Sequence, residues 1–174
     1  YYRPTLEWAY TDMLALRDVT SLGILRELHR WAAHAMVITV WLHMYRVFLT
    51  GSYKPPREFN WVVGVILLLL TLLLSFTGYL LPWDQKGYWA TKVATELAAL
   101  PPVVGGEMQR VVVGGSDYGH HTLTRFFALH AGVLPALMVI VLALHIAMFR
   151  RHGITAESSD RRPDEYFWPK QVAK

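Results

Sequence analysis

The stretch LHRWAAHAMVITVWLH, residues 28–43, decides the fold, because it is apolar enough to enter a bilayer and yet carries histidines. At about 100° per residue, a helix running from His29 to His43 ends roughly 40° short of four full turns, so both imidazoles lie on one face. At about 1.5 Å per residue they are roughly 21 Å apart along the axis. In a hydrocarbon core about 30 Å thick, one histidine therefore lies toward each side of the membrane.

A second stretch, residues 126–149, repeats this arrangement. It contains no Asp, Glu, Lys or Arg, and it carries His130 and His145, which are one position further apart than the first pair. Their spacing passes four helical turns by about 60°, so these histidines also share a broad face. Two helices with two stacked imidazoles each can hold two planar metal cofactors, and bis-histidine ligation of two haems b uses all four side chains.

Other roles for four membrane histidines are packing and a proton path. Ionisable groups in a bilayer are costly and usually mark function, which favours ligation or proton transfer over packing. Zinc is disfavoured, because ligands roughly 21 Å apart cannot share one ion and two histidines leave each site short of ligands.

The composition indicates a membrane protein rather than a large soluble core. Hydrophobic residues make up 53% of the chain and are concentrated in long runs. The chain has no cysteine, which excludes disulfides, iron–sulfur ligation and covalent haem attachment through its own thiols. We expect no signal peptide, since no charged region followed by a cleavage site opens the chain.

The fold class expected is an all-α membrane protein, a bundle of transmembrane helices. An interfacial segment is expected at residues 1–20, the transmembrane domain at 21–150 and a polar tail on the cytoplasmic side at 151–174. Apolar runs of sufficient length predict three spans, at residues 22–48, 61–81 and 122–149.

Two further features are expected within this plan. Residues 89–100, in the long connection before the third span, are expected to form a short helix in the membrane interface. Pro135 is expected to kink the third span, and this kink would absorb the one-residue difference between the two histidine spacings.

Loop charges predict the orientation. Basic residues dominate two segments, with Arg46, Lys54 and Arg57 in the first connection and Arg150, Arg151, Arg161 and Arg162 after the third span. The positive-inside rule places both segments on the cytoplasmic side. The first and third spans are then parallel, so His29 is level with His130, and His43 is level with His145.

Several polar residues near the histidines are candidate cofactor contacts. Haem propionates need cationic partners near the interface, and the arginine fork suits carboxylates. The candidate arginines are Arg26, Arg46, Arg125, Arg150 and Arg151, although each could instead snorkel to the membrane surface. Ser52 could donate a hydrogen bond to a propionate, or it could act only in the turn that follows the first span.

Two glycines and four further histidines complete the candidates. Gly64 and Gly78 have the same spacing as His29 and His43, so they could give clearance for a haem or serve ordinary helix packing. His34 is about 140° around the helix from His29, and its ring is expected to hydrogen-bond to a neighbouring helix. The others are expected to be interfacial, with a quinol proton pathway as a lesser alternative; they are His120, His121 and His152.

Several short motifs occur along the chain. They are Tyr1-Tyr2-Arg3-Pro4-Thr5, Leu28-His29-Arg30-Trp31, His43 to Arg46, Gly51-Ser52-Tyr53, Pro56-Arg57-Glu58, residues 78–85 (GYLLPWDQ), Gly87-Tyr88-Trp89-Ala90, and residues 122–127 (TLTRFF) leading to His130. Together these motifs resemble the N-terminal haem-binding half of the cytochrome b/b6 family. The resemblance covers nearly the whole chain, and the longer spacing of His130 and His145 resembles the b6 type.

The resemblance implies a subunit of a quinol–cytochrome c or plastocyanin oxidoreductase of the bc1/b6f kind. It implies that His29 and His130 hold the outer, low-potential haem, and that His43 and His145 hold the inner, high-potential haem. It also places four residues in the quinol-oxidising pocket, namely Phe76, Tyr79, Ala90 and Val93.

The resemblance also implies partners and segments beyond this chain. The expected partners are a Rieske iron–sulfur protein, a c-type cytochrome and a subunit IV-like C-terminal half, in a dimeric complex without nucleic acid. The family has another span before Tyr1, and in b6 that span carries the cysteine of an extra c-type haem, so such a haem is not attached through this chain. The expected location is an energy-transducing membrane, the bacterial inner membrane rather than a thylakoid. The alternatives are a dihaem anchor of another quinone-linked dehydrogenase or hydrogenase, and a haem-free subunit with proton-relay histidines.

Overall fold

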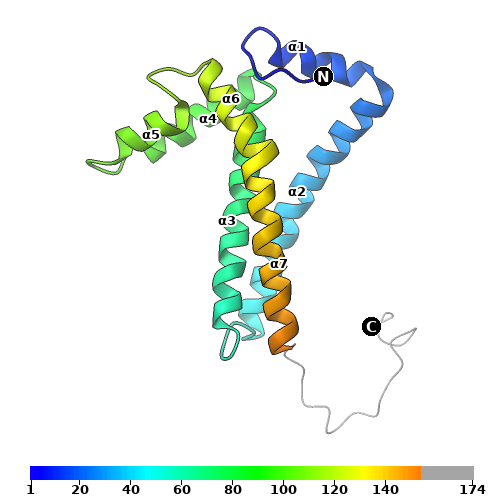
Figure 1. Cartoon of the computed structure of the whole chain (residues 1–174), viewed down its shortest axis with the longest axis vertical. Helices are drawn as coiled ribbons and strands as arrows, with labels where there is room; N and C mark the ends of the chain where they lie inside the picture. Colours follow the sequence, from blue (N-terminus) through cyan, green and yellow to red (C-terminus); the bar gives the residue numbers. More distant parts are fainter. Residues whose placement is uncertain (154–174) are drawn as a thin grey trace.

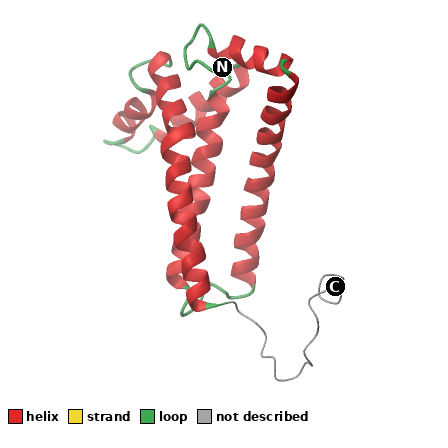
Figure 2. Cartoon of the chain, turned by 45° about the vertical axis from the view of Figure 1, so that its right-hand side comes forward, coloured by secondary structure: helices red, strands yellow, loops and turns green. Residues whose placement is uncertain are grey.

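The structure is a computed structural model that describes residues 1–153, and this part of the chain is all-helical (Figures 1 and 2). The elements in chain order are α1 (Ala9–Asp18), α2 (Thr20–Leu49), α3 (Glu58–Leu80), α4 (Gln85–Ala98), α5 (Gly105–Val113), α6 (His120–Ala128), the π-helical turn η1 (Leu129–Val133) and α7 (Leu134–His152). The polar tail was predicted at residues 151–174, and its residues from 154 onward lie outside the part of the chain that the structure describes.

Three helical stretches are long and apolar enough to cross a membrane. They are Thr20–Leu49, Glu58–Leu80 and the continuous run His120–His152. The three predicted spans are therefore confirmed; five of their six ends lie one to three residues further out, and the second span ends one residue earlier, at Leu80. α3 begins at Glu58 rather than at residue 61. A carboxylate in a first helical turn faces the positive end of the helix dipole, so this charge favours the earlier start.

The third span contains an irregularity one turn before Pro135. The N–H of Leu134 donates to the carbonyl of Leu129, five residues back, which defines the π-turn η1. Pro135 follows in the first turn of α7 and has no N–H to continue an α-helical ladder. The expectation that a kink at Pro135 itself absorbs the extra residue is thus corrected: the π-turn accommodates it between His130 and Pro135.

This π-turn brings the two histidine spacings into agreement. A single π-turn adds one residue without adding its share of rotation. The chain from His130 to His145 therefore turns through about the same angle as the shorter stretch from His29 to His43 in the regular helix α2. Both histidine pairs consequently have the same rotational offset on their helices.

The three spans are packed unequally. α3 packs along α7, whereas α2 has backbone contacts with α1 and α3 alone among the helices of residues 1–153 (Figure 1). None of the residues of α2 is buried. Figure 2 shows α2 standing apart from the paired ribbons of α3 and α7. The spans α2 and α7 therefore face each other through side chains and not through backbone packing.

The end of the bundle that carries α1, α4 and α5, named here the α1 end, contains a small apolar core. Ala9, Leu80, Leu123 and Phe126 are buried together there. The helix predicted at residues 89–100 is α4, which begins at Gln85, four residues earlier than expected; its place in the membrane interface stays a prediction. Asp84 explains this start, because its Oδ1 accepts the Gly87 N–H at 2.7 Å and caps the helix. The helix α5 was not expected from the sequence.

An ion pair closes the N-terminal segment onto α1. The carboxylate of Asp12 accepts three hydrogen bonds from Arg3. The Arg3 backbone N–H donates at 2.8 Å, and the Arg3 guanidinium donates through Nε at 3.0 Å and through Nη2 at 2.6 Å. The Arg3 guanidinium lowers the pKa of Asp12 below its usual value. Tyr2 donates to the Leu81 carbonyl at 2.7 Å, and burial, with a smaller contribution from Asp12, raises the pKa of Tyr2 to about 12. The segment is thus tied both to α1 and to the end of α3.

We expect Asp12→Asn to loosen this segment at neutral pH. A carboxyl whose pKa is lowered by folding stabilises the folded state above its unfolded pKa, and this stabilisation is lost as the pH falls below about 3.9. Limited proteolysis near residue 3 should therefore become faster in the variant at pH 7 and equally fast in both proteins at low pH. Asp18→Asn is the control, since Asp18 is exposed and lies 3.9 Å from Arg17. Equal cleavage rates for all three proteins at pH 7 would contradict the assignment.

Candidate cofactor site between the membrane helices

The structure brings the four membrane histidines together in two pairs, each joining α2 to the third span. The ring centroids of His29 and His130 are 6.0 Å apart, with an interplanar angle of 86°. Those of His43 and His145 are 6.4 Å apart, at 84°. Two imidazoles that bind one metal ion from opposite sides, each at about 2.0–2.1 Å, have centroids roughly 6 Å apart. Both pairs therefore have the spacing that one metal ion between them requires.

His130 is held in a tautomer that suits ligation. Its Nδ1 lies 3.0 Å from the Leu74 carbonyl and 3.4 Å from Thr77 Oγ1. A carbonyl oxygen only accepts, so Nδ1 carries the proton and Nε2 keeps its lone pair. Metal-binding histidines usually donate their other ring N–H in this way, which fixes the ring orientation and raises its basicity.

The His145 ring has a different environment. Its Nδ1 is buried without a hydrogen-bond partner, and the side-chain oxygen of Asn60 is likewise buried and unpartnered. The Asn60 backbone carbonyl lies beside the ring but outside hydrogen-bond geometry for Nδ1. The two histidines of the third span therefore both face α2 but differ in their hydrogen bonding.

Each of the two glycines of α3 lies against one of these imidazoles. A Cβ atom on Gly78 would be 2.5 Å from Cε1 of His130 and 2.9 Å from its Nδ1. A Cβ atom on Gly64 would be 3.4 Å from Cε1 of His145, an ordinary close contact. The missing side chains therefore make room first for the histidine rings, and at Gly78 this room is essential.

The residues present fit a planar, iron-bearing cofactor at each pair. Within residues 1–153, no group of three or more His, Cys, Asp or Glu residues is close enough to hold a metal ion. A metal bound by two facing histidines must then take its remaining ligands from a cofactor, as haem iron does from its macrocycle. The space between α2 and α7, without backbone contact, is where two such macrocycles would lie.

The predicted polar contacts are dispersed along the span ends. Arg26 pairs with Glu27 at 2.9 Å, and Arg125 donates to the Val111 carbonyl of α5. Ser52 Oγ lies 2.8 Å from Thr50 Oγ1 within the turn after α2. The remaining three arginines make no ion pair within residues 1–153 and are exposed; they are Arg46, Arg150 and Arg151. A propionate role for any of these residues stays a prediction.

The remaining histidines lie outside the two pairs. His34 is exposed, and its Nδ1 lies 2.7 Å from the Arg30 carbonyl of its own helix. The expectation of an interhelical partner for His34 is therefore corrected: the preceding helical turn satisfies it. His120 lies 3.3 Å from the Glu7 carboxylate at the α1 end. His121 is exposed and His152 is partly buried at the opposite end.

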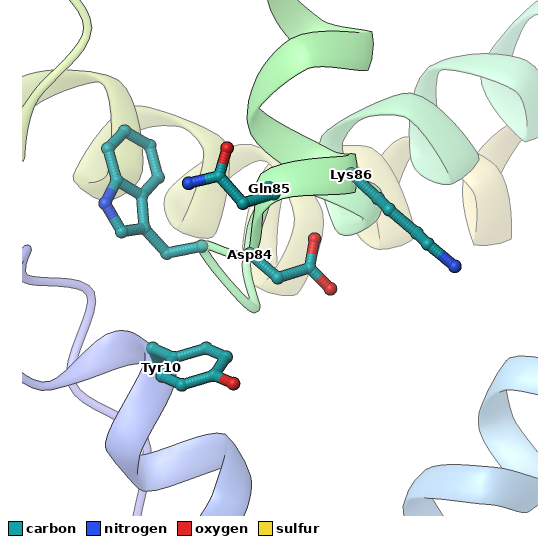
Figure 3. Close-up of a pocket in the computed structure, with 5 residues that line it drawn as sticks. Tyr10, Asp84, Gln85 and Lys86 are labelled. Atoms are coloured by element: carbon teal, nitrogen blue, oxygen red, sulfur yellow. The ribbon is translucent and has the colours of Figure 1, made fainter.

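Within residues 1–153, the four predicted quinol-pocket residues line neither of the two cavities at the start of α4. Phe76 packs against Phe126 at 5.4 Å, whereas Tyr79 and Val93 are about half exposed and Ala90 is exposed. A cavity of about 510 Å³ instead lies between α1 and the start of α4 (Figure 3). Its lining residues are Tyr10, Trp83, Asp84, Gln85 and Lys86.

The fold and the site define an integral membrane protein with two pairs of facing histidines between its membrane helices. A family described as "Cytochrome b(N-terminal)/b6/petB" matches residues 34–174. The chain belongs to this cytochrome b N-terminal/b6 family.

Known relatives agree with this assignment. Cytochrome b6 of Gracilaria tenuistipitata var. liui is 47% identical over 156 residues, which cover 89% of this chain and 73% of that protein. Cytochrome b6 of Prochlorococcus marinus (strain MIT 9303) is 45% identical over 156 residues, covering 89% and 72%. A solved structure titled "Hyperthermophilic respiratory Complex III" superposes with a TM-score of 0.85 at 27% identity. The match covers 99% of this chain but 49% of the complex III chain. This chain therefore spans about half the length of that structural neighbour.

Proposed function

We propose that this chain is the dihaem cytochrome b subunit of a quinol-oxidising complex of the bc1/b6f kind. The observation that carries the proposal is the pair of facing imidazoles at each of two levels, 6.0 and 6.4 Å apart. The cytochrome b6 relatives and the complex III neighbour support the same class of complex. The similar proteins make this family's redox role the best-supported function for the two sites.

The chain's own residues act in this function as ligands and as a scaffold. His29 and His130 would hold one haem b near the α1 end, and His43 and His145 would hold the other. Two haems at these sites would supply one-electron redox centres. α2 sets their separation, since its histidines are about 21 Å apart along the axis. The apolar faces of α2, α3 and α7 keep water and ions away from the iron ligands.

The direction of electron flow follows from the expected orientation. If the basic loop after α2 faces the cytoplasm, the α1 end is the outer, quinol-oxidising side. Electrons would then pass from the His29–His130 site to the His43–His145 site and on to quinone, coupled to proton translocation. A Rieske protein, a c-type cytochrome and a C-terminal half of cytochrome b would be the partners, in a dimer in the inner membrane of a bacterium. Tyr79 and the exposed face of α4 would contribute to a quinol pocket completed by a partner.

A redox-titrated difference spectrum of the purified membrane complex tests this function. We expect two b-type components with distinct midpoint potentials, because the two histidine pairs have different surroundings. The same preparation without quinol should show both components on chemical reduction. A single component, or none, would reject the stacked pair and favour a proton-relay role for the histidines.

A further inference from the structure

The helix α3 carries the same pattern twice, roughly four helical turns apart, once beside each histidine of the third span. Gly78 lies against His130 and Gly64 lies against His145. The residue directly before the glycine differs between the two copies: it is Thr77 beside His130 and Val63 in the equivalent position beside His145. Both side chains are buried, with exposed fractions of 3% and 2%.

Thr77 presents its oxygen to the His130 ring. Its hydroxyl donates to the Leu73 carbonyl at 2.8 Å, the shorter of its two carbonyl contacts, so its proton is directed along its own helix. The lone pairs of Oγ1 are then free to accept, and Nδ1 of His130 lies 3.4 Å away. With the Leu74 carbonyl at 3.0 Å, the Nδ1–H has two acceptors.

In the second copy the hydroxyl is missing and the carbonyl is less well placed. Val63 has no hydroxyl, and the Asn60 carbonyl, which corresponds to that of Leu74, lies outside hydrogen-bond geometry for Nδ1 of His145. The two sites therefore have equivalent ligands and equivalent glycines but unequal acceptors behind the ligand of the third span. Acceptors for the second ring N–H increase the negative charge on an imidazole and its basicity as a ligand. A more basic axial ligand stabilises ferric over ferrous iron, which lowers the reduction potential.

We propose that Thr77 is a positioning residue that, together with the Leu74 carbonyl, lowers the potential of the haem at the His29–His130 site relative to the other. The inference rests on the proposed function, since it requires a haem at each pair. It gives a reason why the two haem potentials would differ. The residue responsible is on α3, whereas the histidine ligands are on α2 and the third span.

Reciprocal substitutions test this inference by spectroelectrochemical titration of the purified holoprotein complex. Thr77→Val is expected to raise the midpoint potential of the lower-potential component and to leave the other unchanged. Val63→Thr is expected to lower the potential of the higher-potential component, because the His145 ring gains a hydroxyl acceptor. Thr77→Ser keeps the hydroxyl and should retain the potential of the unsubstituted complex.

Thr71→Val is the matched control, because Thr71 is equally buried on α3, donates to its own helix at Leu67 and makes no hydrogen bond to a histidine within residues 1–153. It should leave both potentials unchanged. Unshifted potentials in both Thr77→Val and Val63→Thr, or equal shifts of both components, would overturn the inference. Two components in the unsubstituted complex would still support the proposed function in that case, whereas their absence would reject the function itself.

Discussion

Replacing Gly78 by alanine is expected to abolish haem binding at the His29–His130 site. The new Cβ atom would lie 2.5 Å from Cε1 and 2.9 Å from Nδ1 of His130, inside the contact distance of real Cβ atoms. The ring must then move, and it loses the Leu74 carbonyl that sets its tautomer. Because α3 packs along α7, the helices cannot separate to relieve the clash without losing their shared packing.

Gly64→Ala is the matched control for this experiment. Its Cβ atom would be 3.4 Å from Cε1 of His145, an ordinary van der Waals contact. We therefore expect Gly78→Ala to lose one b-type component, and Gly64→Ala to keep both with at most a small change. A haem assay per complex and a difference spectrum measure this. Equal loss in both variants would show that the glycines make room for the macrocycles rather than for the imidazoles.

Replacing a single histidine of the third span is expected to remove one haem and leave the other. His130→Ala should lose the component of the α1 end, and His145→Ala that of the opposite end, because each pair is separate and each iron needs both axial ligands. His34→Ala should keep both components, since His34 is bonded only to its own helix within residues 1–153. Quantitative haem extraction with difference spectroscopy gives the result, and full retention of both haems in His130→Ala would disprove the ligand assignment.

Much of the candidate site follows from spacing alone. The positions of His29 and His43 on one face depend only on the regular rotation of an α-helix, and apolar length defined the three spans. The level pairing of the histidines came from counting spans and loop charges, and the ring separations agree with it. These are local or topological properties, which a sequence carries directly.

Other features depended on contacts between distant residues. The partner of Arg125 is the carbonyl of Val111, on a helix that the sequence pattern did not reveal. His34 is satisfied by its own helix rather than by a neighbour. Competing partners of this kind depend on which groups packing brings within reach, and spacing within one helix does not contain that information.

The sequence by itself determined the class of protein, the three spans, and the four histidines arranged at two levels, because hydrophobic length and helical periodicity act along one chain segment at a time. Only the tertiary structure decided how the third span matches α2, through a π-turn before Pro135. It also decided that the two sites differ, with acceptors behind His130 and none in hydrogen-bond geometry behind Nδ1 of His145. Such hydrogen bonds join residues of different helices, and they exist only once α3 and α7 pack in one register.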